Sequence, residues 1–179
     1  MNKNKFLNRN FYVNIATVFG LGFHSSMPGT LGSFVAMLVR FVIDIPLWAI
    51  VGVSLLGVWS TALTEKLLDG SEPCPVRANC SVKNLRCKKD PRCTVIDEVA
   101  GMWCTVYLLP KNFLVGGFFL FRLLDILKPF PINRMEKFHG GWGIMLDDIV
   151  GGIIGNVILQ AINAYFFRSG WLFGLIQNF

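Results

Sequence analysis

Apolar runs separated by short polar breaks fill most of this sequence, and they leave few folds open to it. The five runs cover residues 11–23, 31–63, 99–109, 113–127 and 147–167. Hydrophobic residues make up 53% of the chain of 179 residues and charged residues only 16%, against about 25% charged residues in soluble domains. Such a composition excludes a disordered chain and a disulfide-rich miniprotein. It predicts an all-α fold, a small helical membrane protein with a single domain over residues 1–179.

Proline divides the apolar runs into helical hairpins. Pro46 follows Asp44 and Ile45 in the middle of the second run, and because proline lacks an N–H group, this break predicts helices near 31–43 and 46–63. The second of these should be long enough to cross a bilayer, which takes roughly 20 residues. The apolar stretch 11–23 resembles a signal peptide without a cleavage site, so we expect it to remain as an interfacial or buried helix.

Basic residues are concentrated in three segments that these hairpins would place on one side of a membrane. Residues 1–10, 64–96 and 128–146 together hold 13 of the 17 lysines and arginines. Cytoplasmic loops are rich in such residues, so the pattern predicts a multi-pass protein with these segments in the cytoplasm. The net charge of +6 is then explained by topology and by membrane lipids as partners. No nucleic-acid-binding motif accompanies it, and we expect no nucleic-acid partner.

Acidic residues lie at the predicted cytoplasmic ends of three helices. Capping explains an acid at a helix N-terminus, but it does not explain Asp125, which lies near a C-terminus where the helix dipole disfavours an anion. Clustered carboxylates near hydrocarbon are costly unless a cation lies among them, and oxygen ligands suit Mg²⁺. The candidate metal ligands are Asp97, Glu98, Asp125, Asp147 and Asp148.

Cationic and hydroxyl side chains beside these acids suit a bound phosphate. Arg122 and Lys128 flank Asp125 at intervals of three residues, which places all three in one sector of a helix; an intrahelical ion pair is the alternative explanation. Thr30 and Ser33 precede an apolar helix, where hydroxyls and free N–H groups bind anions, although they also serve as ordinary caps.

His139 is a further candidate, because it precedes a glycine pair in the loop 128–146 and could donate a hydrogen bond to phosphate. A lone loop histidine is more often simply part of the polar surface.

Four blocks of the sequence together resemble the phosphatidylglycerophosphatase A family. They are Pro-Gly-Thr-Leu-Gly-Ser at 28–33, Asp-Glu at 97–98 followed by Gly-Met-Trp at 101–103, Phe-Arg-Leu-Leu-Asp-Ile-Leu-Lys-Pro-Phe-Pro-Ile at 121–132, and Gly-Gly-Trp-Gly-Ile-Met-Leu-Asp-Asp at 140–148. The blocks come in the family's order, and the resemblance extends from about residue 14 to residue 160.

The resemblance implies a Mg²⁺-dependent phosphatase of the bacterial cytoplasmic (inner) membrane with its active site facing the cytoplasm. Such an enzyme hydrolyses phosphatidylglycerophosphate, its lipid substrate, to phosphatidylglycerol and phosphate in phospholipid biosynthesis. On this basis we expect phosphate binding by Thr30, Ser33, Arg122, Lys128 and His139. We expect catalytic roles for Asp97, Asp125, Asp147 and Asp148, some of them as metal ligands with Glu98.

The segment 64–96 departs from the family pattern, because it is longer and rich in cysteine. Cys74, Cys80, Cys87 and Cys93 either bind zinc or belong to a tolerated insertion, since structural zinc sites have more closely spaced pairs. Cys80 and Arg86 have the spacing of a cysteine phosphatase, but the flanking histidine and glycines of such a site are missing. Cys104 lies within a predicted helix, where packing is its expected role.

Two other classes of function remain open at this point. A small ion transporter or channel subunit also uses acids in membrane helices, but it should carry them near the middle of the bilayer. A non-catalytic protein that binds anionic lipids would explain the basic loop but not the acids.

Overall fold

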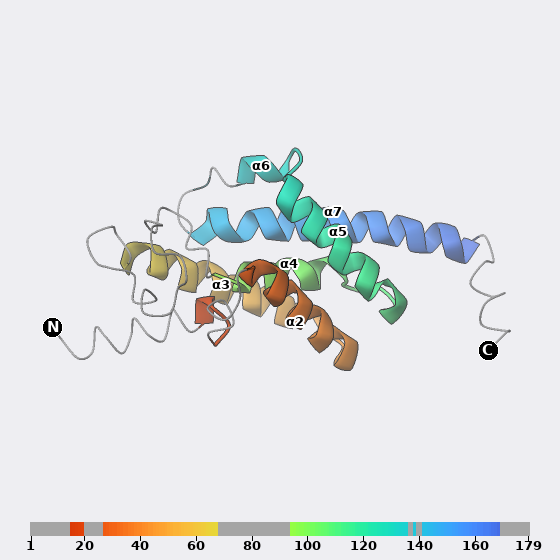
Figure 1. Ribbon diagram of the computed structural model, residues 1–179, viewed down its shortest axis with the longest axis horizontal. Helices are drawn as coiled ribbons and strands as arrows, with labels where there is room; N and C mark the ends of the chain where they lie inside the picture. The colour runs from red at the N-terminus through yellow and green to blue at the C-terminus, as the bar shows by residue number, and fades with distance from the viewer. Residues whose placement is uncertain (1–14, 20–26, 68–93, 136–137, 139–140, 169–179) are drawn as a thin grey trace.

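Helices form the regular structure of the computed structural model, which describes residues 15–19, 27–67, 94–135, 138 and 141–168 (Figure 1). The elements are α2 (Pro28–Val42), α3 (Leu47–Leu67), α4 (Ile96–Thr105), the short 3₁₀ helix η2 (Lys111–Phe113), α5 (Leu114–Leu127), α6 (Ile132–Met135) and α7 (Gly141–Arg168). No strand occurs among the described residues, and the predicted all-α fold is confirmed.

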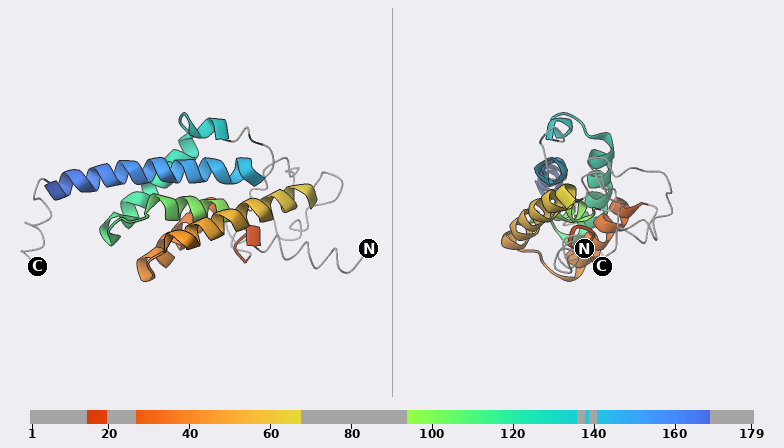
Figure 2. Two further views of the ribbon diagram at one scale, coloured as in Figure 1. Left: turned by 180° about the vertical axis from the view of Figure 1, so that it is seen from behind. Right: turned by 90° about the vertical axis from the view of Figure 1, so that its left-hand side faces the viewer.

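Two hairpins and one long helix make up the bundle. The turn at residues 43–46 joins α2 to α3, as predicted, and residues 106–113 join α4 to α5. The helix α7 packs against α3, α4, α5 and α6, and its C-terminal part extends beyond the other helices (Figures 1 and 2). The starts of α2, α4 and α7 and the ends of α3 and α5 therefore gather at one end of the bundle.

Glycine allows α4 and α7 to pack closely side by side. A Cβ atom at Gly152 would collide with the carbonyl oxygen of Gly101, and one at Gly101 would lie 2.7 Å from the carbonyl oxygen of Asp148. Small residues at such positions allow two helix backbones to approach each other. The start of α4, which carries Asp97 and Glu98, is thereby held beside Asp148 of α7.

The buried core lies around α4. Its larger cluster consists of Ala36, Val95, Val99, Met102, Val106, Leu114 and Phe121, and these come from α2, from α5 and from α4 with its two flanking residues. The described part of the 11–23 stretch, residues 15–19, is a short turn against this core, where the N–H of Val95 donates to the carbonyl oxygen of Ala16 at 2.9 Å. Ala16 and Thr17 are buried, whereas Phe19 at the end of this turn is exposed.

Polar side chains hold the opposite end of the bundle together. Arg40 at the end of α2 is ion-paired with Asp44 and donates to the carbonyl oxygen of Leu109 at 3.2 Å. Asn156 of α7 donates to the carbonyl oxygens of Thr105 and Tyr107 at 3.0 and 2.8 Å, just where α4 ends. Thr105 is the last residue of α4, so its carbonyl group has no intrahelical partner, and those of Tyr107 and Leu109 lie in the connection that follows.

Helix lengths differ from those expected in ways that matter for the membrane. The helix α4 ends at Thr105 instead of residue 109, and α7 begins at Gly141 instead of residue 147. Among the described helices, only Gly141–Phe166 is both long and apolar enough to cross a bilayer. The described apolar stretches Pro28–Val42 and Leu47–Ala62 are shorter. Because α3 as a whole has 21 residues, a crossing by the helix expected near 46–63 stays a prediction.

Three sequence-based interpretations lie outside the described residues. They concern the zinc or insertion alternatives for Cys74, Cys80, Cys87 and Cys93, the spacing of Cys80 and Arg86, and the phosphate-binding role of His139. Cys104 is described, and it is a free, half-buried thiol on α4 beside Gly152, which agrees with a packing role.

Candidate active site

A cavity of about 270 Å³ opens at the end of the bundle where α2, α4 and α7 begin and α5 ends. Its walls combine four aspartates, one glutamate and two cations with a few small or apolar groups. The lining residues are Met27, Pro28, Gly29, Thr30, Thr94, Asp97, Glu98, Arg122, Asp125, Lys128, Ile144, Asp147 and Asp148. A site of this composition is suited to a ligand that carries several negative charges together with a cation.

Three carboxylates converge inside the cavity. Asp97 and Glu98 in the first turn of α4 and Asp148 of α7 each offer an oxygen, and these oxygens lie within 4.8 Å of one another. Asp97 and Asp148 are buried. Like charges this close together repel strongly unless a proton or a cation lies between them. Only oxygen atoms are offered, which is the donor set that Mg²⁺ and Ca²⁺ prefer.

Glu98 shows most clearly that the cluster suits a cation. Its Oε2 atom is buried and has no hydrogen-bond partner. Burial, reinforced by the neighbouring carboxylate of Asp97, raises the pKa of Glu98 well above its usual range. An unpaired buried carboxylate oxygen is costly, and a metal ion at this position would remove that cost. The donors and their burial therefore fit a divalent cation.

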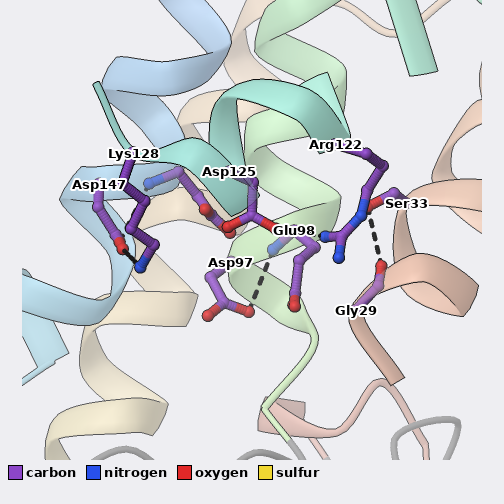
Figure 3. A network of polar contacts seen from close by, with 9 residues as sticks. Gly29, Ser33, Asp97, Glu98, Arg122, Asp125, Lys128 and Asp147 are labelled. Carbon is purple, nitrogen blue, oxygen red and sulfur yellow. Dashed lines mark hydrogen bonds and ion pairs between the residues drawn. The ribbon is translucent and has the colours of Figure 1, made fainter. Parts of the chain in front are cut away.

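Each of the other two carboxylates is paired with a cation (Figure 3). The Nη1 atom of Arg122 donates to Asp125 at 2.5 Å within α5, and the Nζ atom of Lys128 donates to Asp147 at 2.7 Å between α5 and α7. Lys128 caps the C-terminus of α5 in the left-handed region, with a φ of 42°, and this conformation allows its side chain to turn back into the cavity. The sequence-based alternative of an Arg122–Asp125 pair is thus present in the structure.

The start of α2 supplies the remaining wall. Met27 is its N-cap without a side-chain cap bond, and Gly29 and Thr30 lie in the first turn, where N–H groups have no intrahelical partner. A Cβ atom at Gly29 would collide with the Oε1 atom of Glu98 and would lie 3.2 Å from Nη1 of Arg122. Glycine at this position therefore lets the helix terminus approach both the carboxylates and the guanidinium. Helix N-termini favour bound anions.

Most of the predicted site residues meet in this one cavity. Thr30, Asp97, Glu98, Arg122, Asp125, Lys128, Asp147 and Asp148 all line it. Ser33 does not, because it is fully buried in α2 and its hydroxyl donates to the carbonyl oxygen of Gly29 at 2.8 Å. Its expected role in phosphate binding stays a prediction.

Five lining residues were not among the expected site residues, namely Met27, Pro28, Gly29, Thr94 and Ile144. Thr94 is the most informative of them, because it is a buried threonine just ahead of α4. Its position before Asp97 and Glu98 was the available signal, since a hydroxyl near a helix start is suited to an anion or to bound water. Pro28, Gly29 and Ile144 lie in the blocks 28–33 and 140–148, whereas Met27 is apolar and nothing in its sequence context distinguishes it from other core or surface residues.

Comparison with known proteins identifies the family of this chain. Residues 14–163 match the family described as phosphatidylglycerophosphatase A. The chain belongs to the phosphatidylglycerophosphatase A family. The match contains every described residue that lines the cavity.

Individual relatives agree with the family match. Phosphatidylglycerophosphatase A of Escherichia coli is 34% identical over 91% of this chain and 87% of its own length, and that of Haemophilus influenzae is 33% identical over 83% and 86%. A protein of Bacteroides thetaiotaomicron with the proposed name phosphatidylinositol-3-phosphatase is 32% identical over 82% and 90%. No solved structure matches the chain.

The family confirms that the chain is an enzyme, a phosphatase, and supports activity on a lipid substrate in phosphatidylglycerol synthesis.

Proposed function

We propose that this phosphatase removes the terminal phosphate of phosphatidylglycerophosphate and uses Mg²⁺ to do so. One observation carries the proposal: a single cavity brings together three convergent carboxylates, two cations and the N-terminus of α2. Carboxylates alone would repel a phosphate, and cations alone would not need the carboxylates. The combination suits a phosphate monoester bound beside a divalent cation.

Asp97, Glu98 and Asp148 would hold the metal, because their oxygens converge and Glu98 has a buried oxygen without a partner. When bound, Mg²⁺ would neutralise charge on the phosphate and make a nearby water molecule more acidic. The remaining carboxylates, Asp125 and Asp147, already have cationic partners and are less available as ligands.

Arg122, Lys128 and the first turn of α2 would bind the phosphate oxygens. The Nε atom of Arg122 is buried without a hydrogen-bond partner, so the guanidinium keeps unused donor capacity in the cavity wall. Thr30 and the free N–H groups beside it face the same space. These donors would orient the ester and stabilise the charge that develops on the transferred phosphoryl group.

Hydrolysis requires one water molecule and two proton movements. The water oxygen attacks phosphorus while the bond between phosphorus and the glycerol oxygen breaks. We assign Asp125 as the group that takes the proton from water, since binding of Arg122 to phosphate would free its carboxylate. Lys128 would offer a proton to the departing glycerol oxygen. The products are phosphatidylglycerol and inorganic phosphate.

The decisive experiment is phosphate release from phosphatidylglycerophosphate by the purified full-length protein in detergent, with Mg²⁺ or with excess chelator. We expect activity that chelator removes and Mg²⁺ restores. Because the Bacteroides relative is named for a different headgroup, phosphatidylinositol 3-phosphate belongs in the same assay. Chelator-resistant activity would contradict the metal assignment, and hydrolysis of neither lipid by folded protein would contradict the proposed reaction.

The site's location also bears on topology. The basic segments 64–96 and 128–146 lie in the sequence between helix ends on the cavity side, the first between α3 and α4 and the second between α5 and α7. We infer that the cavity faces the cytoplasm at the inner membrane and that α7 crosses the bilayer away from it.

A further inference from the structure

The helices α2 and α5 carry matching rows of side chains that lead away from the cavity. On α5, Phe118, Arg122 and Asp125 follow one another at helical spacing, and all three are half-buried. On α2, Thr30 and Phe34 follow the same spacing. On each helix the residues of the row that line the cavity are polar, and the residue one helical turn away from the cavity is a phenylalanine.

The two rows meet in a continuous seam, which we call the α2/α5 seam. The rings of Phe34 and Phe118 pack edge to face with centroids 6.1 Å apart, and Phe119 packs similarly on Phe118 at 5.4 Å. Phe34 is 43% exposed and Phe119 is 66% exposed, so the seam is open on its outer side. At the far end Lys111 lies over the ring of Phe41, at 5.7 Å from its centroid.

The other lateral side of α5 is closed. The ion pair between Lys128 and Asp147 joins the end of α5 to α7 across the cavity wall, and α6 packs against α7 beside it. The cavity wall includes residues of α2, α5 and α7 and the start of α4, but none of α3 among the described residues. The α2/α5 seam is thus the apolar surface that continues directly from the phosphate-binding cations into hydrocarbon.

We propose that the α2/α5 seam holds the first part of an acyl chain of the lipid whose phosphate occupies the cavity. This proposal rests on the proposed function, and it adds the place where an acyl chain of that substrate would lie. The lipid has an anionic headgroup joined to an apolar chain, and the two helices offer Arg122 in the polar cavity followed by Phe34 and Phe119 in the apolar seam. From Arg122 to Val115 the seam extends about 10 Å along α5.

The occupant is the substrate's own chain and not the surrounding bilayer in general. Bulk lipid would contact every exposed apolar residue of the molecule alike, including Leu55 of α3, which is 59% exposed. A chain fixed by its headgroup in the cavity would depend on the seam alone. The two possibilities therefore predict different responses to the same kind of substitution on the two helices.

The test compares long-chain phosphatidylglycerophosphate with glycerophosphoglycerophosphate, which carries no acyl chains, at saturating Mg²⁺ in detergent. In Phe119→Ala, and in the double variant Phe34→Ala/Phe119→Ala, we expect the ratio of kcat/KM for the long-chain lipid over the chainless ester to fall roughly tenfold. The matched control Leu55→Ala should keep the wild-type ratio. Thermal unfolding of each variant in the same detergent monitors folding.

Three outcomes would overturn the proposal. They are an unchanged ratio in the seam variants, an equal loss with both substrates, or an equal fall of the ratio in Leu55→Ala, which would indicate general bilayer contact. Failure of the proposed function would differ from all of these, because the wild-type protein itself would then hydrolyse neither ester.

Discussion

The carboxylates of the cavity divide into two groups at the level of single residues. Asp125 and Asp147 are neutralised by cations at 2.5 and 2.7 Å, whereas Asp97, Glu98 and Asp148 face one another. The sequence indicated all five as metal ligands and could not separate them, because helical spacing does not show which side chains point at each other across three helices. Three-dimensional packing makes that distinction.

Asp125 should be essential for turnover and dispensable for folding. In Asp125→Asn the carboxylate can no longer accept a proton, so we expect kcat to fall on the order of 100-fold or more. Phosphate release in detergent measures this, with thermal unfolding as the check on structure. Asp44→Asn, the same chemical change on an exposed aspartate at the opposite end of the bundle, should keep wild-type activity. A fully active Asp125→Asn protein would remove this residue from the mechanism.

Asp148 should couple metal binding to stability. Mg²⁺ at roughly a hundred times its dissociation constant should raise the free energy of unfolding of the wild-type protein by about 2.7 kcal/mol. In Asp148→Asn the metal-free protein should be more stable than the wild type, because one of three mutually repelling carboxylates is gone, and the gain with Mg²⁺ should largely disappear. Thermal unfolding with Mg²⁺ and with chelator measures both effects. An undiminished gain in the variant would place the metal elsewhere.

At the scale of elements, proline predicted the helical boundaries well and glycine predicted them poorly. Pro46 separates α2 from α3 where the sequence indicated. The glycines at 140–143 indicated a loop, but α7 begins at Gly141, where a Cβ atom would collide with the carbonyl oxygen of Val58 in α3. This glycine serves close packing between helices, a tertiary reason that no local pattern reveals.

The end of α4 was missed for a related reason. Its apolar pattern continues to Leu109, yet the helix stops at Thr105 and Leu108 adopts a left-handed conformation with a φ of 57°. Asn156 of α7 binds the carbonyl oxygens that this early end exposes. A partner fifty residues away along the chain is invisible to hydrophobic periodicity.

Asn156 should therefore contribute to stability more than its neighbour Gln160. Asn156→Leu removes two hydrogen bonds, of 3.0 and 2.8 Å, and should lower the free energy of unfolding by about 1–3 kcal/mol because the carbonyl groups lose their partner. Gln160→Leu removes one bond of 3.4 Å and should have a smaller effect. Denaturation in the same detergent compares the two variants. Equal effects would indicate that α4 ends independently of α7.

At the scale of the whole molecule, the lengths of the helices imply an asymmetric position in the membrane. The helices α2, α4 and α5 are 15, 10 and 14 residues long, or about 22, 15 and 21 Å, against a hydrocarbon core of about 30 Å, whereas α3 has 21 residues, or about 31 Å. The helix α7 has 28 residues and extends about 42 Å. The several crossings expected from the sequence stay a prediction, because α4 ends before apolar residues such as Leu108, whereas α3 and α7 have the length of a crossing.

This asymmetry predicts where single cysteines will react in cells. In a variant whose five native cysteines are replaced by serine, a cysteine at Tyr165, near the end of α7, should react with a membrane-impermeant maleimide added outside the inner membrane. A cysteine at Arg134 in α6, on the cavity side, should react only after the membrane is permeabilised. Retained phosphatase activity would show that each variant is folded. The reverse labelling pattern would place the cavity outside, and labelling of both sites in intact cells would exclude a crossing by α7.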